Sequence, residues 1–199
     1  IFMSFKYRSI EFMIEAGSGR LIPKKKLSQL EENYLNFGNI IYIYKGARDM
    51  YIGQTKNFYK RHAQHCAEKG LKTMGRTTKY VDGSYDKVIV AFQNKLITQT
   101  SLDDIERKFI TYITADNEMT SITVNNHTEG NYSIAYENQD LVNSEFVLPF
   151  WKELFEKGYV QCENLDDIKN SILFKYSPFF SLSDEQQRVI NGVLANDTN

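Results

Sequence analysis

Four side chains suited to phosphate chemistry lie close together in this sequence: Tyr42, Tyr51, Arg61 and His65. A phenol has a pKa of about 10 in water, so a tyrosine can act as a base only among positive charges. Residues 39–80 supply such charges, because they hold nine Lys and Arg against two acidic residues, whereas residues 81–199 hold nine against nineteen. This distribution indicates a phosphate-binding surface around the four side chains.

A predicted β-hairpin and a helix carry these side chains. Ile40–Tyr44 and Met50–Ile52 are apolar, β-branched and aromatic, and turn residues separate them, which is typical of a hairpin. Gly53 is expected to end the second strand, and a cap at Thr55 or Asn57 can start a helix directly afterwards. The arginine and the histidine share one stripe of that helix at four-residue spacing. The two tyrosines are therefore expected to face its first two turns.

This stretch resembles the core motif of the GIY-YIG nucleases. Tyr51-Ile52-Gly53 matches the second signature of the family and Ile40-Ile41-Tyr42 the first. The ten-residue step from Tyr51 to Arg61 and the four-residue step from there to His65 also fit the pattern. The sequence departs from the family at Ile40, where glycine is usual, and its hairpin is short.

The resemblance implies roles for the four side chains in phosphodiester hydrolysis, which needs an activated water and a cation at the developing negative charge. Tyr42 is implied to be the general base for water, and Arg61 to pair with phosphate oxygens through its planar fork. Tyr51 and His65 are implied to position the phosphate and the water. If a tyrosine phenolate is the base, cleavage is expected to rise with pH through the neutral range.

A metal-binding carboxylate is expected on a second helix. Val88–Phe92 is an apolar run that predicts a third strand, and Ser101–Thr114 predicts a helix with acidic residues in its first turn. Glu106 lies on this helix beside apolar residues of its own row, so partial burial is expected, and buried carboxylates are normally paired or bound to metal. The family has its single metal-binding glutamate at this point, so Glu106 is implied to bind one Mg²⁺ or Mn²⁺.

Further candidate residues lie around and after the motif. The segment Thr123–Asn131 is similar to the asparagine-containing end of the family's domain, and Asn126 is favoured over Asn125 as a buttressing amide, although turn chemistry accounts for either. Basic residues near the site are expected to bind the phosphates of a nucleic acid. These residues are Lys56, Lys60, Lys72, Arg76 and Lys79.

The predicted fold class is α/β (α+β): a small antiparallel three-stranded sheet flanked by helices, with a C-terminal helical appendage. Residues 1–135 are expected to form the nuclease domain with an N-terminal extension, and residues 136–180 a helical linker region. In the extension, Ser4–Met13 is compatible with a strand or a short helix. The further predicted helices are Leu27–Leu35, Phe146–Lys157 and Asn164–Phe174.

Residues 181–199 are similar to the motif that precedes the P-loop in superfamily-one helicases and related ATPases. Gln186 is the matching, adenine-contacting glutamine, and no Gly-rich P-loop follows it in the sequence. The chain is therefore expected to be the N-terminal part of a protein that continues into an ATPase domain, which would be its partner in the same native chain.

Composition narrows the class of protein. A chain of 199 residues is long enough to bury a core without disulfide bonds. Cys66 and Cys162 match no metal-ligand spacing and indicate the reduced thiols of a cytoplasmic protein. No stretch approaches the ~20 consecutive apolar residues of a membrane span, so no membrane association is expected.

Two functions besides catalysis stay open at this point. The residues favour a divalent-metal-dependent endonuclease that hydrolyses DNA, with RNA as an alternative substrate. The departure at Ile40 leaves open a nucleic-acid-binding module without catalysis. The C-terminal similarity leaves open a module that regulates a larger ATPase or helicase. The sequence does not distinguish restriction, repair and bacterial phage defence as the process served.

Overall fold

The fold is that of a computed structural model, which describes residues 7–67, 78–93, 95–117, 122–126 and 136–170. Its strands are β1 (Arg8–Glu15), β2 (Arg20–Pro23), β3 (Ile40–Lys45), β4 (Asp49–Thr55), β5 (Lys87–Phe92) and β6 (Thr123–Val124). Its helices are α1 (Gln29–Phe37), α2 (Phe58–Cys66), α4 (Gln99–Asn117), α5 (Gln139–Val142), the π-helical turn η1 (Asn143–Val147), α6 (Leu148–Glu156) and α7 (Leu165–Asn170).

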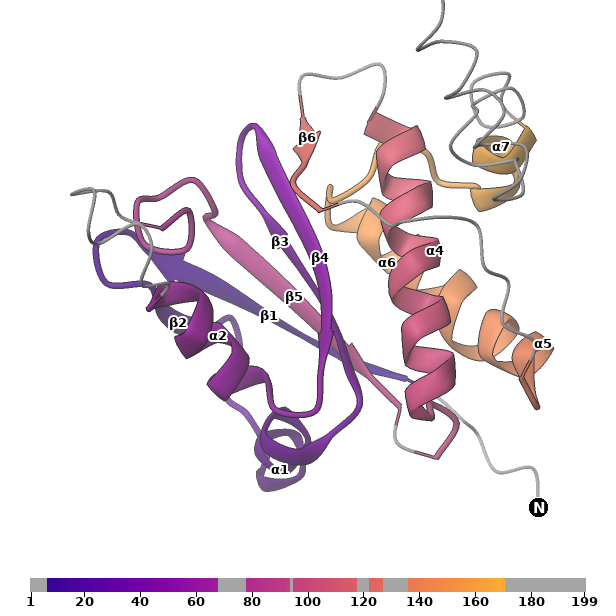
Figure 1. Ribbon diagram of the computed structural model, residues 1–199, viewed down its shortest axis with the longest axis horizontal. Helices are drawn as coiled ribbons and strands as arrows, with labels where there is room; N and C mark the ends of the chain where they lie inside the picture. The colour runs from indigo at the N-terminus through magenta and orange to yellow at the C-terminus, as the bar shows by residue number, and fades with distance from the viewer. Residues whose placement is uncertain (1–6, 68–77, 94, 118–121, 127–135, 171–199) are drawn as a thin grey trace, which may run out of the picture.

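The strands form one six-stranded sheet in the order β2-β1-β5-β3-β4-β6 (Figure 1). Neighbouring strands are antiparallel except β4 and β6, which are parallel. The prediction of a three-stranded sheet is therefore wrong, although the three predicted strands are present as β3, β4 and β5. The sequence pattern missed β6 because two residues carry no periodicity, and it left the conformation of β1 open because charged and apolar residues both interrupt its alternation.

Helices cover both faces of the sheet (Figure 1). One core contains Ile40, Tyr42 and Tyr44 of β3, together with residues of α1 and α2. The other core contains Ile41 and Ile43 of β3, together with residues of α4, α6 and α7. Because β3 is buried on both faces, its sequence is continuously apolar rather than alternating.

The C-terminal helices pack on the same core as α4. The rings of Phe150 and Trp151 on α6 contact Phe109 of α4, with centroid distances of 5.3 and 6.4 Å. The predicted helix Phe146–Lys157 is present as the end of η1 followed by α6. The start of the predicted ATPase domain, including Gln186, lies outside the described residues. None of the helices within the described ranges is long and apolar enough to cross a lipid bilayer.

Gly53 lies inside β4 rather than at its end, which corrects the sequence expectation. In the antiparallel register Gly53 is the partner of Tyr42 on β3. The aromatic ring of Tyr42 lies directly over this glycine, since a Cβ atom there would overlap Cζ and Oη of the tyrosine. The glycine is therefore required for the close approach of a ring to the backbone of the neighbouring strand.

We expect Gly53→Ala to lower the free energy of unfolding by about 1–3 kcal/mol, the usual cost of forcing an extra methyl group into a packed site. A double-mutant cycle measured by urea denaturation tests the cause. In a Tyr42→Leu background the ring is gone, so the same substitution should cost less than about 0.5 kcal/mol. An equal cost in both backgrounds would show that the Tyr42 ring is not what excludes a side chain at this position.

Candidate active site

The hydroxyl group of Tyr42 is the centre of a cluster of polar side chains. Arg61 Nε donates a hydrogen bond to Tyr42 Oη at 3.3 Å, and His65 Nε2 lies 3.2 Å from the same oxygen. Arg61 and His65 project from successive turns of α2, whose first turn is capped by the side chain of Asn57. Because the guanidinium can only donate, Tyr42 Oη accepts from it and keeps its own proton for His65.

Two further tyrosines enclose this cluster. The ring of Tyr51 stacks on Tyr42 with a centroid distance of 6.2 Å, and its hydroxyl group also hydrogen-bonds with Arg61. Tyr80 stacks on the His65 ring with a centroid distance of 4.3 Å. No sequence pattern pointed to Tyr80, because it lies in an irregular segment and contacts His65 only in the folded protein.

Burial controls the protonation of the cluster. It raises the pKa of Tyr42 well above the ordinary value of a phenol, and the opposing effect of the Arg61 guanidinium is smaller. The expectation that surrounding positive charge lowers this pKa is therefore wrong for the folded protein. Burial, with help from the charge of Arg61, lowers the pKa of His65 to about 4. Tyr42 and His65 are consequently both neutral at pH 7.

The second histidine of α2 holds the helix to the rest of the fold. His62 Nε2 donates to the carbonyl oxygen of Gly19 at 2.7 Å, so its Nδ1 accepts from the hydroxyl group of Tyr44 at 2.7 Å. Both nitrogens are therefore engaged within the protein. This arrangement leaves His65 as the histidine of α2 that contacts Tyr42.

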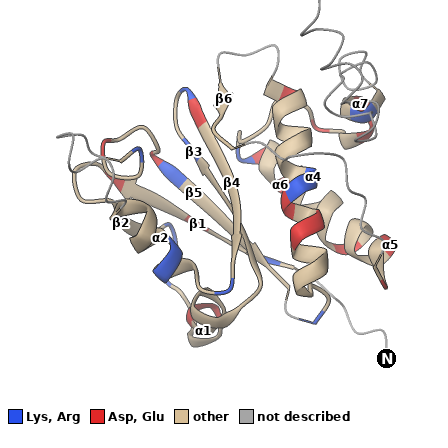
Figure 2. Cartoon of the chain, in the orientation of Figure 1, with Lys and Arg blue, Asp and Glu red and all other residues tan. Residues whose placement is uncertain are grey.

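Glu106 lies on α4, which packs on the opposite face of the sheet from α2 (Figure 1). Its half-buried carboxylate accepts a hydrogen bond from Gln54 Nε2 at 3.1 Å and another from the Gln54 main-chain amide. Burial raises the pKa of Glu106, the neighbouring Asp103 raises it further, and the positive charge of Arg61 lowers it. Arg61 thus acts on Glu106 electrostatically across β4, and Figure 2 shows basic residues on α2 and both acidic and basic residues on α4, on either side of this strand.

The main-chain amides and carbonyls on the outer edge of β4 form hydrogen bonds with a different group at each outward-facing residue. The carbonyl oxygen of Met50 accepts from the main-chain amide of Asn125 at 2.8 Å. At Ile52 the Asn126 side chain takes the place of a strand, since Oδ1 accepts from the Ile52 amide and Nδ2 donates to the Ile52 carbonyl. At Gln54 the partner of the main-chain amide is Glu106. Asn126 therefore lies beside the site as a group that pairs with the strand backbone.

The predicted nucleic-acid-binding residues differ in their exposure and in their contacts. Lys56 and Lys60 are exposed beside the start of α2. Lys79 is also exposed, but its ammonium group forms an ion pair with Asp49 and a hydrogen bond with Asn125 at 3.1 Å. Lys72 and Arg76 lie outside the described residues.

Glu106 is the described residue best placed to hold a metal ion. Within the described ranges, no three His, Cys, Asp or Glu side chains come together as a metal-binding group. The carboxylates of Glu106 and Asp103 accept from the same Gln54 amide, so two anionic groups lie near each other at this edge of β4. Carboxylate oxygens suit Mg²⁺ and Mn²⁺, and Mg²⁺ commonly takes one or two of them and completes its shell with water and phosphate. The residues present fit an ion held in this way.

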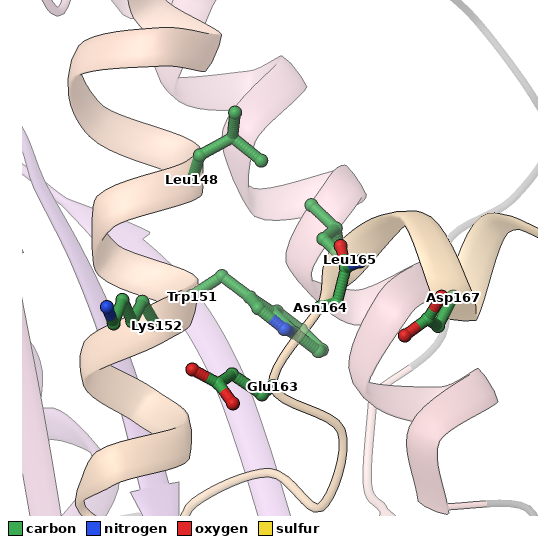
Figure 3. A pocket seen from close by; sticks show the side chains of 7 residues that line it. All are labelled: Leu148, Trp151, Lys152, Glu163, Asn164, Leu165 and Asp167. Carbon is green, nitrogen blue, oxygen red and sulfur yellow. The ribbon is translucent and has the colours of Figure 1, made fainter.

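A separate hollow of about 410 Å³ lies on the C-terminal helices (Figure 3). It is formed by α6, by the segment that leads into α7 and by the start of α7. Its lining residues are Leu148, Trp151, Lys152, Glu163, Asn164, Leu165 and Asp167. None of the candidate site residues lines it, so the hollow is not part of the Tyr42 cluster.

Residues 38–117 match the family model of the GIY-YIG catalytic domain. The matched region runs from the start of β3 to the end of α4, so it includes the Tyr42 cluster and Glu106, whereas Asn126 lies beyond it. A GIY-YIG domain implies nuclease activity in general, a nucleic acid as substrate and the use of a divalent metal ion. Searches of the curated proteins and of the solved structures gave no match.

Because the pKa of His65 is lowered in the folded protein, the free energy of unfolding should depend on pH. Because His65 titrates at about 4 when folded and a free histidine at about 6.5, the unfolded chain binds more protons between these values. The contribution of neutral His65 to the free energy of unfolding is therefore complete above pH ~6.5 and is lost as the pH falls toward 4. Over this range we expect the native protein to lose about 3 kcal/mol more unfolding free energy than His65→Gln. Urea denaturation at several pH values measures this, and equal pH slopes for the two proteins would contradict it.

Proposed function

We propose that the chain is a divalent-metal-dependent endonuclease that hydrolyses phosphodiester bonds of DNA. The observation that carries this proposal is the position of Arg61, which hydrogen-bonds Tyr42 and Tyr51 and interacts electrostatically with Glu106. One guanidinium thus links a potential base to a potential metal ligand. This is the arrangement that attack of water on a phosphate requires, with a proton acceptor on one side and positive charge on the other.

The proton acceptor in this proposal is the Tyr42–His65 pair. The attacking water transfers a proton to Tyr42 Oη while the hydroxyl proton of Tyr42 passes to His65 Nε2, 3.2 Å away. The water oxygen uses its electron pair to form the new bond to phosphorus, while the bond from phosphorus to one nucleotide oxygen breaks and that oxygen leaves with the bonding pair and takes a proton from solvent. Arg61 Nε, 3.3 Å from the same tyrosine oxygen, stabilises any negative charge that develops there. Because His65 is neutral at pH 7, it is ready to accept the proton.

The phosphate would lie between Arg61 and Glu106. The guanidinium has donors besides Nε, and their planar arrangement matches the oxygens of a phosphate. Glu106 would hold one Mg²⁺ or Mn²⁺, which when bound supplies positive charge at the developing phosphorane oxygens. Exposed Lys56 and Lys60 would contact the phosphates of neighbouring nucleotides, giving affinity without sequence preference.

Ile40 does not argue against catalysis. This residue stands where GIY-YIG nucleases usually have glycine, and its side chain is completely buried in the core beside Leu35, Phe58 and Phe92. It fills apolar space rather than displacing a polar group of the cluster. The extension of the chain into an ATPase domain, and service in restriction, repair or phage defence, remain predictions.

Arg61→Ala and Glu106→Gln should each reduce the nicking of supercoiled plasmid by at least about 100-fold, because removal of one group that stabilises transition-state charge costs about 3–4 kcal/mol. The assay contains Mg²⁺ or Mn²⁺, and Glu156→Gln on the exposed side of α6 is the matched control. DNA binding should persist in Glu106→Gln, as measured by gel shift, because it depends mainly on basic residues. Nicking by Glu106→Gln at the native rate would remove the proposed metal ligand.

The route of the proton predicts how cleavage depends on pH. Tyr42→Phe should abolish cleavage, because the ring stays and the proton acceptor is lost. If His65 takes the tyrosine proton, the native rate should be nearly constant above pH ~6 and should fall only where His65 becomes protonated. Single-turnover rates between pH 5 and 9 test this. A tenfold rise per pH unit through the neutral range would instead mean that Tyr42 must ionise beforehand, as a free phenolate base would require.

A further inference from the structure

We propose that Gln54 is the positioning residue that fixes Glu106 for a divalent cation. This inference rests on the proposed metal site and names the residue on which its geometry depends. Gln54 follows Gly53 on β4 and projects toward α4, on the opposite face of the strand from Tyr51. No feature of the sequence motif identified it.

Gln54 holds the Glu106 carboxylate with two donors. Its side-chain Nε2 donates to Glu106 Oε2 at 3.1 Å, and its main-chain amide donates to the same carboxylate. A glutamate side chain has three rotatable bonds, so two donors from one residue of a strand restrict its freedom strongly. A carboxylate has about four lone-pair sites, so these bonds leave room for a cation.

The Gln54 amide group is itself fixed in orientation. Gln99 Nε2 donates to Gln54 Oε1 at 3.0 Å, so the acceptor end of the amide is occupied. The NH₂ end therefore faces the carboxylates of Glu106 and Asp103, and its two hydrogens are donated to them. Gln99 also donates to Asp103 at 3.0 Å. The result is a closed network in which the amide can present only donors to the glutamate.

These hydrogen bonds are of the kind that orient a metal-binding carboxylate without contacting the metal. Carboxylates that bind metal are usually held by a further hydrogen-bond donor, and loss of that donor commonly costs 10–100-fold in metal affinity or activity. Asp103 adds a second negative charge beside Glu106, a repulsion that a divalent cation would relieve. A role limited to joining β4 to α4 would need neither the double contact with Glu106 nor a nearby anion.

Direct binding of Mn²⁺ tests the inference independently of cleavage. The free Mn²⁺ signal in electron paramagnetic resonance, recorded during titration of the intact chain with manganese chloride, gives the dissociation constant. Gln54→Met keeps the length of the side chain and removes its amide, so we expect the dissociation constant to rise about tenfold or more. Gln99→Met leaves Gln54 in place but frees its orientation, so a smaller rise of about threefold is expected. Gln29→Met on α1 is the matched control and should bind as the native chain does.

The same variants separate positioning from a loss of fold. Gln99 is exposed, so its variant should unfold like the native protein in urea and still bind Mn²⁺ more weakly. For Gln54→Met, excess Mn²⁺ should restore plasmid nicking, whereas DNA affinity without metal should be unchanged. Native Mn²⁺ affinity in folded Gln54→Met would overturn the inference, as would Mn²⁺ binding that Glu106→Gln leaves intact. If Mn²⁺ binding by the native chain depends on Glu106 and on Gln54 and yet the chain cuts no DNA, the proposed function fails and the inference stands.

Discussion

The close contact between the Tyr42 ring and the backbone at Gly53 is the constraint on which the site depends. Only a strand position without a side chain allows a ring from the neighbouring strand to lie across it. This contact fixes the tyrosine hydroxyl group above β4, within hydrogen-bonding distance of Arg61 and His65 on α2. The phenol is also buried in the core between the sheet and α2, and this burial raises its pKa. Its chemistry therefore depends on the neighbours that exchange protons with it.

The edge of β4 lets residues from both faces of the sheet act together. Helix α2 covers one face and α4 the other, yet the positive charge of Arg61 lowers the pKa of Glu106. They can do so because β6 pairs with β4 only at Asp49 and Met50, and beyond that point the strand is bordered by side chains. Asn126 and Glu106 satisfy the exposed amides that a longer strand would have covered. A short β6 thus leaves the edge of the sheet available to polar groups.

The sequence predicted the parts of the fold that local patterns determine. The hairpin and the helix carrying Glu106 follow from apolar runs and capping residues, and the structure has them. Of the two predicted caps for the helix after the hairpin, Thr55 and Asn57, the structure uses Asn57. The six-stranded sheet could not be predicted, because the pairing of β1 with β5 joins segments far apart in the chain. The positions of Gln54 and Tyr80 beside the site were missed for the same reason. The surplus of positive charge in the sequence also failed to predict the pKa of Tyr42. Burial outweighs the nearby positive charge, and burial depends on the folded structure.

The most direct test of this account is the position of a bound cation. Crystals of the chain with an oligonucleotide and Mn²⁺ allow the ion to be located by anomalous scattering. We predict an anomalous peak within direct coordination distance of a Glu106 carboxylate oxygen, and no such peak in Glu106→Gln. An ion coordinated elsewhere, with Glu106 turned away from the phosphate, would contradict it.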